Sequence, residues 1–394
     1  MKRLVVLVAV LVQVFASRQV SYSDYRLYRL TPRTAWALKE LQKLQNRGEE
    51  VQFWTDVRTV DVPVDVLVPK YDAIKIEKFI KNYEVDAVLL NANVQDSINE
   101  ENEESETSSH FRWDKYHTLN EINEWLMSLE ERFPEHAKLI NIGKSHEQRD
   151  ILGVRLSFRP QNANRVVFIE SNANAREWIT SAISTYLIDQ ILTSSDPEMR
   201  TIIDRFDWFI VPVVNPDGFE YTKTFDRLWR KTRGPHSLIC YGVDFQRNWE
   251  TYWWRQDSDN PCSEIYKGPS EFSEPSVEYL ARFLGKMGKN IVGYVAFNSQ
   301  SSGHKKKYLE NDSRMMEIRF GNKTKEGNVE IILDSNVYGG MEWVKTKFNT
   351  PILLNYHVRD RGRYGLIIPH SQIVPISKET FKSLISEVSR FDSR

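Results

Sequence analysis

Three arginines are the residues of this chain whose chemistry is easiest to interpret. Arg176, Arg233 and Arg247 stand in segments that mix charged, aromatic and amide residues. A guanidinium group binds a carboxylate through two parallel charge-assisted hydrogen bonds, so this residue type is suited to bind carboxylate groups. The other interpretation is that these arginines are packing or ion-pair residues, since buried arginines need partners in either case. The sequence leaves both interpretations open.

Nucleophilic chemistry has little support in the sequence. The chain contains no Gly-x-Ser-x-Gly turn of the kind that presents a catalytic serine. Cys240 and Cys262 are its two cysteines, and they lack the Cys-x-x-Cys spacing of redox and metal sites. An even pair most simply forms one disulfide in an oxidising compartment, which leaves no free thiol for catalysis.

The start of the chain has the pattern of a secretory signal. Met1-Lys2-Arg3 is basic, Leu4–Val14 is apolar, and Val14-Phe15-Ala16 offers small residues at the cleavage positions. We therefore expect residues 1–16 to be a signal peptide. The apolar run is too short to anchor the chain in a bilayer, and no later stretch is long and apolar enough. The sequence predicts a secreted, extracellular protein without a membrane anchor.

Length and charge narrow the classes of function. The chain has 394 residues, which suffice for two domains and a large core. Its formal net charge of −1 gives no support for nucleic-acid binding, which usually shows a strong basic bias. The basic run His304-Lys305-Lys306-Lys307 is short, and we interpret it as a solvated loop.

An acidic segment divides the mature chain near residue 100. Asn99 to Ser109 reads NEENEESETSS, which is polar and lacks large apolar groups. Such a segment favours solvent, so we expect an exposed linker over residues 99–111. Residues 20–98 and residues 112–394 are then separate domains.

Hydrophobic periodicity predicts a different fold class for each domain. In the first domain the predicted elements are strand Tyr22–Leu30, helix Thr34–Gln45, strands Val51–Trp54 and Val62–Val68, helix Ala73–Phe79 and strand Ala87–Leu90. This β-α-β-β-α-β order predicts a small α+β sandwich of ferredoxin type. In the second domain they are helices Leu119–Phe133 and Glu177–Leu192 and buried strands Arg165–Ile169 and Trp208–Val214. Apolar strands interleaved with helices indicate an α/β domain with a parallel or mixed sheet.

The second domain contains several long motifs in order: Asn174-Ala175-Arg176-Glu177-Trp178-Ile179, Asn215-Pro216-Asp217-Gly218-Phe219, Leu228–Arg233 (LWRKTR), Gly242–Trp249 (GVDFQRNW) and Gly362-Arg363-Tyr364-Gly365. With these motifs the chain resembles the secreted pancreatic-type (A/B) zinc metallocarboxypeptidases. Tyr25–Val68, which contains Phe53-Trp54-Thr55-Asp56, is similar to the inhibitory prodomain of that family. The resemblance implies a prodomain followed by an α/β domain with a mixed central sheet flanked by helices. It also implies that Cys240 and Cys262 form the family's disulfide.

The positions that hold zinc in this family depart from its pattern. The resemblance places the ligands at Asn174, Glu177 and Asn298, where the family has His, Glu and His. A catalytic zinc needs three protein ligands and an open position for water, and it prefers imidazole, thiolate or carboxylate to a neutral amide. Glu177 is then the only surviving ligand position, and we expect no bound cofactor.

The two other catalytic positions that the resemblance implies are also substituted in this chain. His357 stands where the resemblance places the Glu that activates water, a contribution of about 10²–10⁴-fold for a positioned base. Ser335 stands where it places the Tyr that closes over the substrate. We therefore expect no functional catalytic residue and an inactive protein. The alternative is an active metallocarboxypeptidase that removes C-terminal residues with an atypical zinc site built from Glu177, His357 and His304.

The positions that hold the peptide are better preserved. The resemblance places Arg176, Arg233, Gln246 and Arg247 where the family steers the substrate carbonyl and grips the terminal carboxylate. We expect a basic pocket for a peptide C-terminus or a protein partner, with the chain's own prodomain over the cleft. We expect neither a nucleic acid nor a membrane as a partner. A third hypothesis is a purely structural or interaction protein whose cleft is closed.

The connecting segment lacks the activation site that the resemblance implies. The family's proenzymes are cut at a basic residue between prodomain and enzyme. Here no Lys or Arg lies between Lys81 and Arg112. A prodomain that is not released stays over the cleft and competes with any peptide.

Overall fold

The computed structural model describes most of the chain after the predicted signal peptide. The described residues are 19–47, 51–102, 111–159, 165–251, 253, 258–299, 315–324, 327–332, 339–358 and 365–392, with the backbone alone given for 315–332 and 391–392. The predicted signal peptide, the linker residues 103–110, His304 and Ser335 lie outside them. Among the described helices, none combines the length and the apolar character needed to cross a membrane.

The N-terminal domain has the predicted β-α-β-β-α-β order. Its elements are β1 (Tyr25–Pro32), α2 (Ala35–Arg47), β2 (Gln52–Phe53), β3 (Val64–Pro69), η1 (Lys70–Asp72), α3 (Ala73–Tyr83) and β4 (Val85–Asn91). The four strands form an antiparallel sheet in the order β2-β3-β1-β4. Helix α2 begins where the Thr34 hydroxyl accepts a hydrogen bond from the Ala37 amide at 3.1 Å, which satisfies one of the free donors of its first turn. Both helices pack on one face of the sheet around Leu30, Leu41 and Val66.

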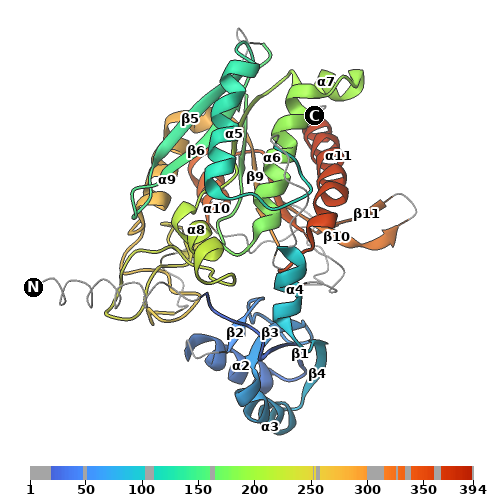
Figure 1. Cartoon of the computed structure of the whole chain (residues 1–394). Coiled ribbons are helices and arrows are strands. Elements are labelled where there is room, and N and C mark those ends of the chain that lie inside the picture. The colour runs from blue at the N-terminus through green and yellow to red at the C-terminus, as the bar shows by residue number, and fades with distance from the viewer. Residues whose placement is uncertain are drawn as a thin grey trace, which may run out of the picture.

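A further helix, α4 (Val94–Glu101), connects the two domains (Figure 1). The prediction of an exposed linker beginning at Asn99 is wrong at this point, because the helix continues through Glu101 and buries its side chain. Val94 and Ile98 provide an apolar face one turn apart, and this face packs at the junction between the domains. The segment is mostly polar, so its composition predicted a linker, but one side of the helix is buried.

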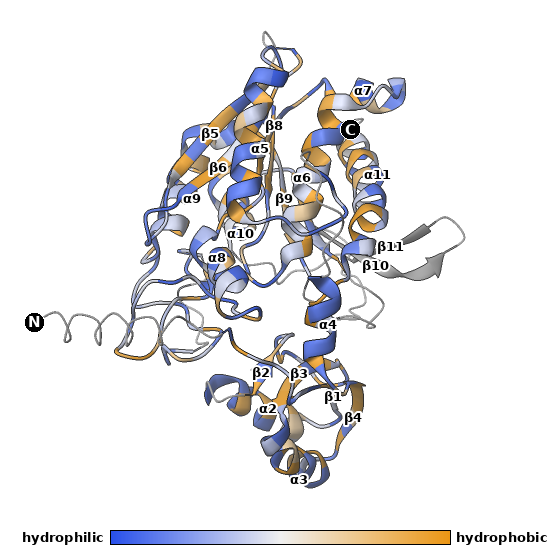
Figure 2. Cartoon of the chain, viewed as in Figure 1, coloured by the Kyte–Doolittle hydropathy of each residue, from blue (hydrophilic) through white to orange (hydrophobic). Residues whose placement is uncertain are grey.

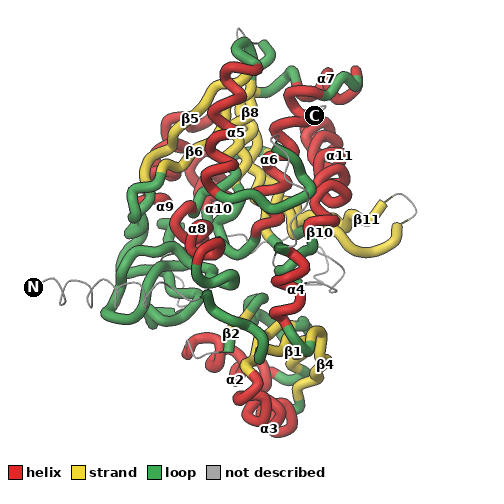
Figure 3. Tube along the Cα trace, in the orientation of Figure 1, coloured by secondary structure: helices red, strands yellow, loops and turns green. Residues whose placement is uncertain are grey.

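The C-terminal domain alternates strands and helices as predicted. Its elements are α5 (Leu119–Arg132), β5 (Ala137–Lys144), β6 (Asp150–Leu156), β7 (Val166–Glu170), α6 (Trp178–Thr193), α7 (Pro197–Ile203), β8 (Asp207–Val211), α8 (Pro216–Thr224), η2 (Phe245–Arg247), α9 (Pro275–Met287), η3 (Gly288–Asn290), β9 (Ile291–Asn298), β10 (Met315–Thr324), β11 (Gly327–Ile332), α10 (Gly340–Phe348), β12 (Ile352–His357), η4 (His370–Gln372) and α11 (Ile373–Asp392). Between α8 and α9 the chain is drawn mostly as loop (Figure 3).

The C-terminal domain is built on one mixed sheet. Its strand order is β11-β10-β12-β9-β7-β8-β6-β5, with parallel pairing from β10 to β8 and antiparallel pairing at both ends. Helices α5, α6 and α11 pack on one core cluster, and α9 and α10 pack on another. Figure 2 shows apolar residues concentrated in the central strands, as expected for a sheet buried on both faces.

Sheet topology gathers polar residues at one edge of the sheet. Strands β7, β9 and β12 are parallel neighbours, so their carboxyl ends lie side by side. Asn298 at the end of β9 is in register with His357 at the end of β12. Open parallel sheets place their ligand sites at this edge. A disulfide between Cys240 and Cys262, as predicted, joins two parts of the neighbouring loops.

Glu170, at the carboxyl end of β7, makes the stability of the fold depend on pH. Burial raises the pKa of this carboxyl to about 7, and the Tyr294 hydroxyl only partly opposes the rise. A raised folded-state pKa means that the folded chain binds more protons, so stability is lost as pH rises from about 4.5 to 7. We expect Glu170→Gln to increase the free energy of unfolding by about 3 kcal/mol at pH 8 and to leave it nearly unchanged at pH 4.5.

Chemical denaturation across this pH range measures the effect. Glu124→Gln, a change at an exposed carboxylate on α5, is the control and should follow the wild-type profile. An unchanged pH profile in Glu170→Gln would contradict the assignment.

Candidate functional site

The loop after β7 is a buried scaffold that fixes Asn174 and Glu177. Asn172 has φ of 58°, in the left-handed region that Asn tolerates better than most residues. Its side-chain amide donates to the carbonyls of Ala175 and Glu177 at 3.3 and 3.2 Å. The Thr180 hydroxyl accepts a hydrogen bond from the backbone N–H of Asn172 and donates one to the Glu177 carbonyl. The turn is therefore held in one conformation before α6 begins.

The Glu177 carboxylate is hydrogen-bonded at both oxygens. Asn174 Nδ2 donates to Oε1 and the Ser299 backbone N–H donates to Oε2, each at 2.8 Å. The side chain is 1% exposed. Burial raises the pKa of Glu177, although the hydrogen bonds from Ser299 and Asn174 oppose the rise. The structure thus brings Asn174 and Glu177, which the sequence analysis named together, into direct contact.

A second chain of amides occupies the ends of β9 and β12. Gln246 Nε2 donates to Asn298 Oδ1, and Asn298 Nδ2 donates to Asn355 Oδ1, both at 2.7 Å. The predicted binding residue Gln246 thus contacts the predicted metal position Asn298. His357 is 7% exposed and lies beside Asn298 in the sheet register.

These residues do not fit a zinc ion of the kind that the family would hold. Within the part of the chain that the structure describes, no three His, Cys, Asp or Glu side chains form a group able to hold a metal. Asn174 Oδ1 is buried without a hydrogen-bond partner, but a neutral amide oxygen is a weak zinc ligand. Asn298 Oδ1 already accepts from Gln246. Among the described residues, Glu177 therefore does not belong to a set of three strong zinc ligands.

The strongest charges of the site are two arginines and two aspartates. Arg247, held by η2, bonds Asp56 Oδ2 at 2.7 Å and also pairs with Asp244. Arg230 lies 2.8 Å from Asp244 Oδ2 and 3.5 Å from Asp56 Oδ1. Asp244 belongs to the C-terminal domain, whereas Asp56 comes from the N-terminal domain. The arginine pair therefore binds one carboxylate from each domain.

In this cluster the opposite charges shift the pKa values of Asp56 and Arg230 more than burial does. Burial by itself raises the pKa of Asp56, but the guanidinium groups of Arg247, Arg230 and Arg58 hold it well below its usual range. Burial lowers the pKa of Arg230, and Asp244 and Asp56 raise it further than burial lowers it. Asp56 and Arg230 are thus kept charged at neutral pH.

Arg176 faces the N-terminal domain but binds its backbone. This side chain is fully buried. It donates to the Phe53 carbonyl at 3.0 Å, to Glu264 Oε1 at 3.0 Å and to the Leu228 carbonyl at 3.3 Å. The N-terminal domain therefore contacts the predicted binding arginines at two adjacent points, Phe53 and Asp56.

Arg233 lies away from the other predicted binding residues. Its guanidinium stacks on Tyr221, with 3.7 Å from Cζ to the ring centre, and lies 3.8 Å from a Glu147 oxygen. Arg230, three residues earlier in the same motif, contacts Asp244 and Asp56 together with Arg247.

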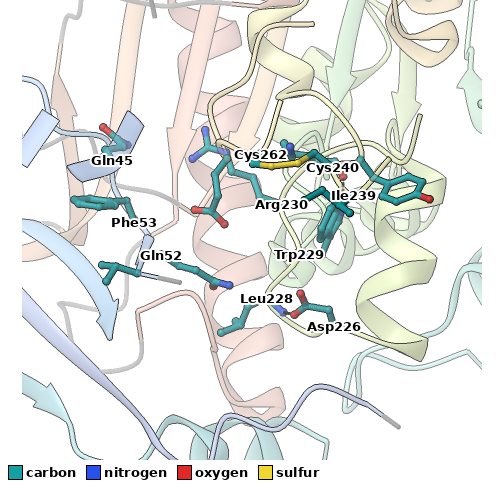
Figure 4. Close-up of a pocket in the computed structure, with 14 residues that line it drawn as sticks. Gln45, Gln52, Phe53, Asp226, Leu228, Trp229, Arg230, Ile239, Cys240 and Cys262 are labelled. Atoms are coloured by element: carbon teal, nitrogen blue, oxygen red, sulfur yellow. Dashed lines mark hydrogen bonds between the residues drawn. A yellow bond between two sulfur atoms is a disulfide. The ribbon is translucent and has the colours of Figure 1, made fainter. Parts of the chain in front are cut away.

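A cavity of about 210 Å³ opens between the two domains (Figure 4). It is lined by Gln52 and Phe53 of β2 and by loop residues of the C-terminal domain, including Trp229, Arg230 and the Cys240–Cys262 disulfide. Pockets for drug-sized ligands usually occupy about 300–1,000 Å³. This cavity accommodates a single side chain rather than a large ligand.

Fold and site together define a two-domain class of protein. A small α+β domain covers the carboxyl edge of a mixed α/β sheet and inserts a carboxylate into an arginine pair. Family models match both parts: "Zinc carboxypeptidase" over residues 122–383 and "Carboxypeptidase activation peptide" over residues 28–101. The chain belongs to the zinc carboxypeptidase family and carries the family's N-terminal activation-peptide domain.

Known relatives and solved structures agree with this assignment. The chain is 33% identical to "Zinc carboxypeptidase A 1" of Anopheles gambiae, over 98% of this chain and 94% of that protein. It is 29% identical to "Carboxypeptidase A1" of Sus scrofa, over 89% of this chain and 88% of that protein. The carboxypeptidase A structure from Helicoverpa armigera has the same fold, with a TM-score of 0.77 and 23% identity over 95% of this chain and 98% of that chain.

The geometry predicts that two substitutions increase zinc binding. We expect the double variant Asn174→His, Asn298→His to bind zinc at least about 100-fold more tightly than the wild type, because it supplies two imidazoles beside Glu177. Metal analysis after dialysis measures the bound zinc. The two single variants are controls and should gain much less, and equal zinc content in all four proteins would contradict the interpretation.

Proposed function

We propose that this protein is a secreted zinc-carboxypeptidase homologue without peptidase activity that binds the C-terminal carboxylate of a peptide or protein. The observation that carries the proposal is the state of Glu177, whose two oxygens accept hydrogen bonds from Asn174 and from the Ser299 amide. A side chain in that state completes a protein hydrogen-bond network. Secretion is inferred from the basic and apolar pattern of residues 1–16.

The loss of catalysis is supported by the chemistry of the remaining side chains. Hydrolysis by a zinc peptidase needs a metal that polarises the carbonyl and a base that activates water. Asn174 and Asn298 are neutral amides engaged with Glu177 and with Gln246 and Asn355. His357 stands where the family resemblance places the base, and an imidazole lacks the negative charge of a carboxylate.

The binding role is supported by the charge of the arginine pair. Asp56 places a carboxylate on Arg247 and Arg230 from outside the C-terminal domain. Without Asp56, the two guanidinium groups would lose a carboxylate that both of them contact. A peptide C-terminus supplies the same chemical group as Asp56 and can replace it.

Zinc content and hydrolysis separate this proposal from an active enzyme. The relatives named as zinc carboxypeptidases favour activity, with an atypical metal site, as the second candidate function. We expect far less than one zinc per chain in the purified protein and no release of C-terminal residues after limited proteolysis. Stoichiometric zinc together with turnover would establish the enzyme instead.

Peptide binding tests the carboxylate pocket directly. We expect Asp56→Asn to increase affinity for peptides with a free C-terminus by about tenfold or more, because it removes the competing carboxylate. Amidated peptides of the same sequence should show no gain. Adding Arg247→Ala to this variant should cost about 2–5 kcal/mol of binding, since the carboxylate loses its main partner.

A matched control distinguishes pocket occupancy from general changes of charge. Asp61→Asn removes an exposed carboxylate of the same domain that pairs with Arg33, and it should leave peptide affinity unchanged. Equal binding of free and amidated peptides by Asp56→Asn would instead favour the third hypothesis, a protein whose former cleft is closed. Isothermal titration calorimetry with both peptide forms makes the measurement.

A further inference from the structure

Strand β4 is the outer strand of the N-terminal sheet. Among the described residues it pairs with β1 alone, whereas β1 and β3 each have a strand on both sides. Figure 1 shows β4 at the outer margin of the N-terminal domain. An edge strand directs every second N–H and C=O away from its own sheet, so it can act as a template for another strand.

The usual protections of an edge strand are weak in β4. Very short strands, Lys, Pro and bulges all discourage pairing with a further strand. The opposite edge strand, β2, has only two residues, whereas β4 has seven residues and contains neither Lys nor Pro. Its register with β1 is regular from Val85 to Leu89 and becomes irregular only beyond Leu89. The regular stretch Val85–Leu89 is therefore suited to pair again.

Most of this stretch is apolar and exposed. Val88 is 58% exposed and Leu89 is 47% exposed, and Ala87 beside them is exposed as well. Its single charged residue, Asp86, is compensated within the domain, because Arg33 Nε donates to Asp86 Oδ2 at 2.7 Å. A strand that pairs with this edge thus covers apolar side chains and meets no uncompensated charge.

The stretch is complementary to a second copy of itself. In an antiparallel pair centred on Ala87, Val85 lies opposite Leu89, Asp86 lies opposite Val88, and Ala87 lies opposite its own copy. The two aspartates are then not directly opposite each other, whereas a parallel pair in the same register would align them. Leu89 of each copy extends the apolar core that already contains Val85 of the other. The smallest side chain of the stretch lies on the axis, where two identical side chains must meet.

We infer that β4 is a dimerisation edge, at which two copies of this chain pair antiparallel through Val85–Leu89 about a two-fold axis at Ala87. The two four-stranded sheets of the N-terminal domains then become one continuous sheet. Such a two-fold contact uses the same surface on both subunits, which is the commonest arrangement in homo-oligomers. The inference goes beyond the proposed function and does not depend on what the arginine pair binds.

The size of the contact sets its expected strength. A single pair of short strands buries less than the about 1,200–2,000 Å² that stable interfaces bury. We therefore expect a reversible dimer with a dissociation constant in the micromolar range. Sedimentation equilibrium of the purified full-length chain measures this constant.

Cysteine cross-linking tests the position of the axis. Copies of Ala87 would have Cα atoms about 4.5–5.5 Å apart, which a disulfide can span, so oxidised Ala87→Cys should run as a covalent dimer on a non-reducing gel. Ala92→Cys is the matched control, because Ala92 is also exposed but its copies would lie about 30 Å apart. The two native cysteines are bonded to each other and leave the introduced thiol free to react.

Charge substitutions at the axis test the contact in solution. Ala87→Lys places two like charges opposite each other and should raise the dissociation constant by about fivefold or more, and Ala87→Glu should do the same. An equal mixture of the two variants should associate again, because opposite charges then meet at the axis. Ala92→Lys should associate like the unchanged protein.

The outcomes decide between a second copy and another occupant of the edge. Monomers throughout the micromolar range, with no cross-link in Ala87→Cys, would overturn the inference and leave β4 to a strand of a different protein or to solvent. A dimer that Ala87→Lys and Ala87→Glu leave unchanged would place the contact elsewhere and would also overturn it. Association of the mixture would show that both variants are folded, so that their separate loss of association supports the inference.

Discussion

The compensation of buried guanidinium charge is the constraint on which the rest of this structure depends. Arg176, Arg227, Arg230 and Arg247 are all nearly or fully buried in the C-terminal domain. A buried charge without a partner is strongly unfavourable, so each must find an oxygen. Asp244 and Glu264 supply part of the compensation, and the N-terminal domain supplies the rest through Asp56, Glu101 and the Phe53 carbonyl. The two domains are thus electrostatically incomplete without each other.

The carboxyl edge of the large sheet is organised by a different principle. Side chains of Asn and Gln meet there, and amides satisfy one another because each offers both a donor and an acceptor. The contacts from Asn174 to Glu177 and from Gln246 through Asn298 to Asn355 show this pairing. These contacts pair most of the amide groups named here within the protein, and Asn174 Oδ1 is the exception among them.

Sequence reasoning found the helices and strands because those depend on local pattern. Apolar spacing located α2, α5 and the buried strands to within a few residues, and the family resemblance paired Cys240 with Cys262. It did not single out Arg230, since side-chain direction in an irregular loop is set by tertiary contacts. It also interpreted Glu101 as linker, because a buried acidic residue looks like a solvated one until its partner, 126 positions away, is known.

The position of the compensating carboxylates has a consequence for how the protein is made. The N-terminal domain emerges from the ribosome first, and small domains fold as units during synthesis. Asp56 and Glu101 are therefore already presented on a folded surface when the arginines of the second domain emerge. The first domain then serves as a template on which the second one buries its cations, so that the order of synthesis matches the order in which the charges must be neutralised.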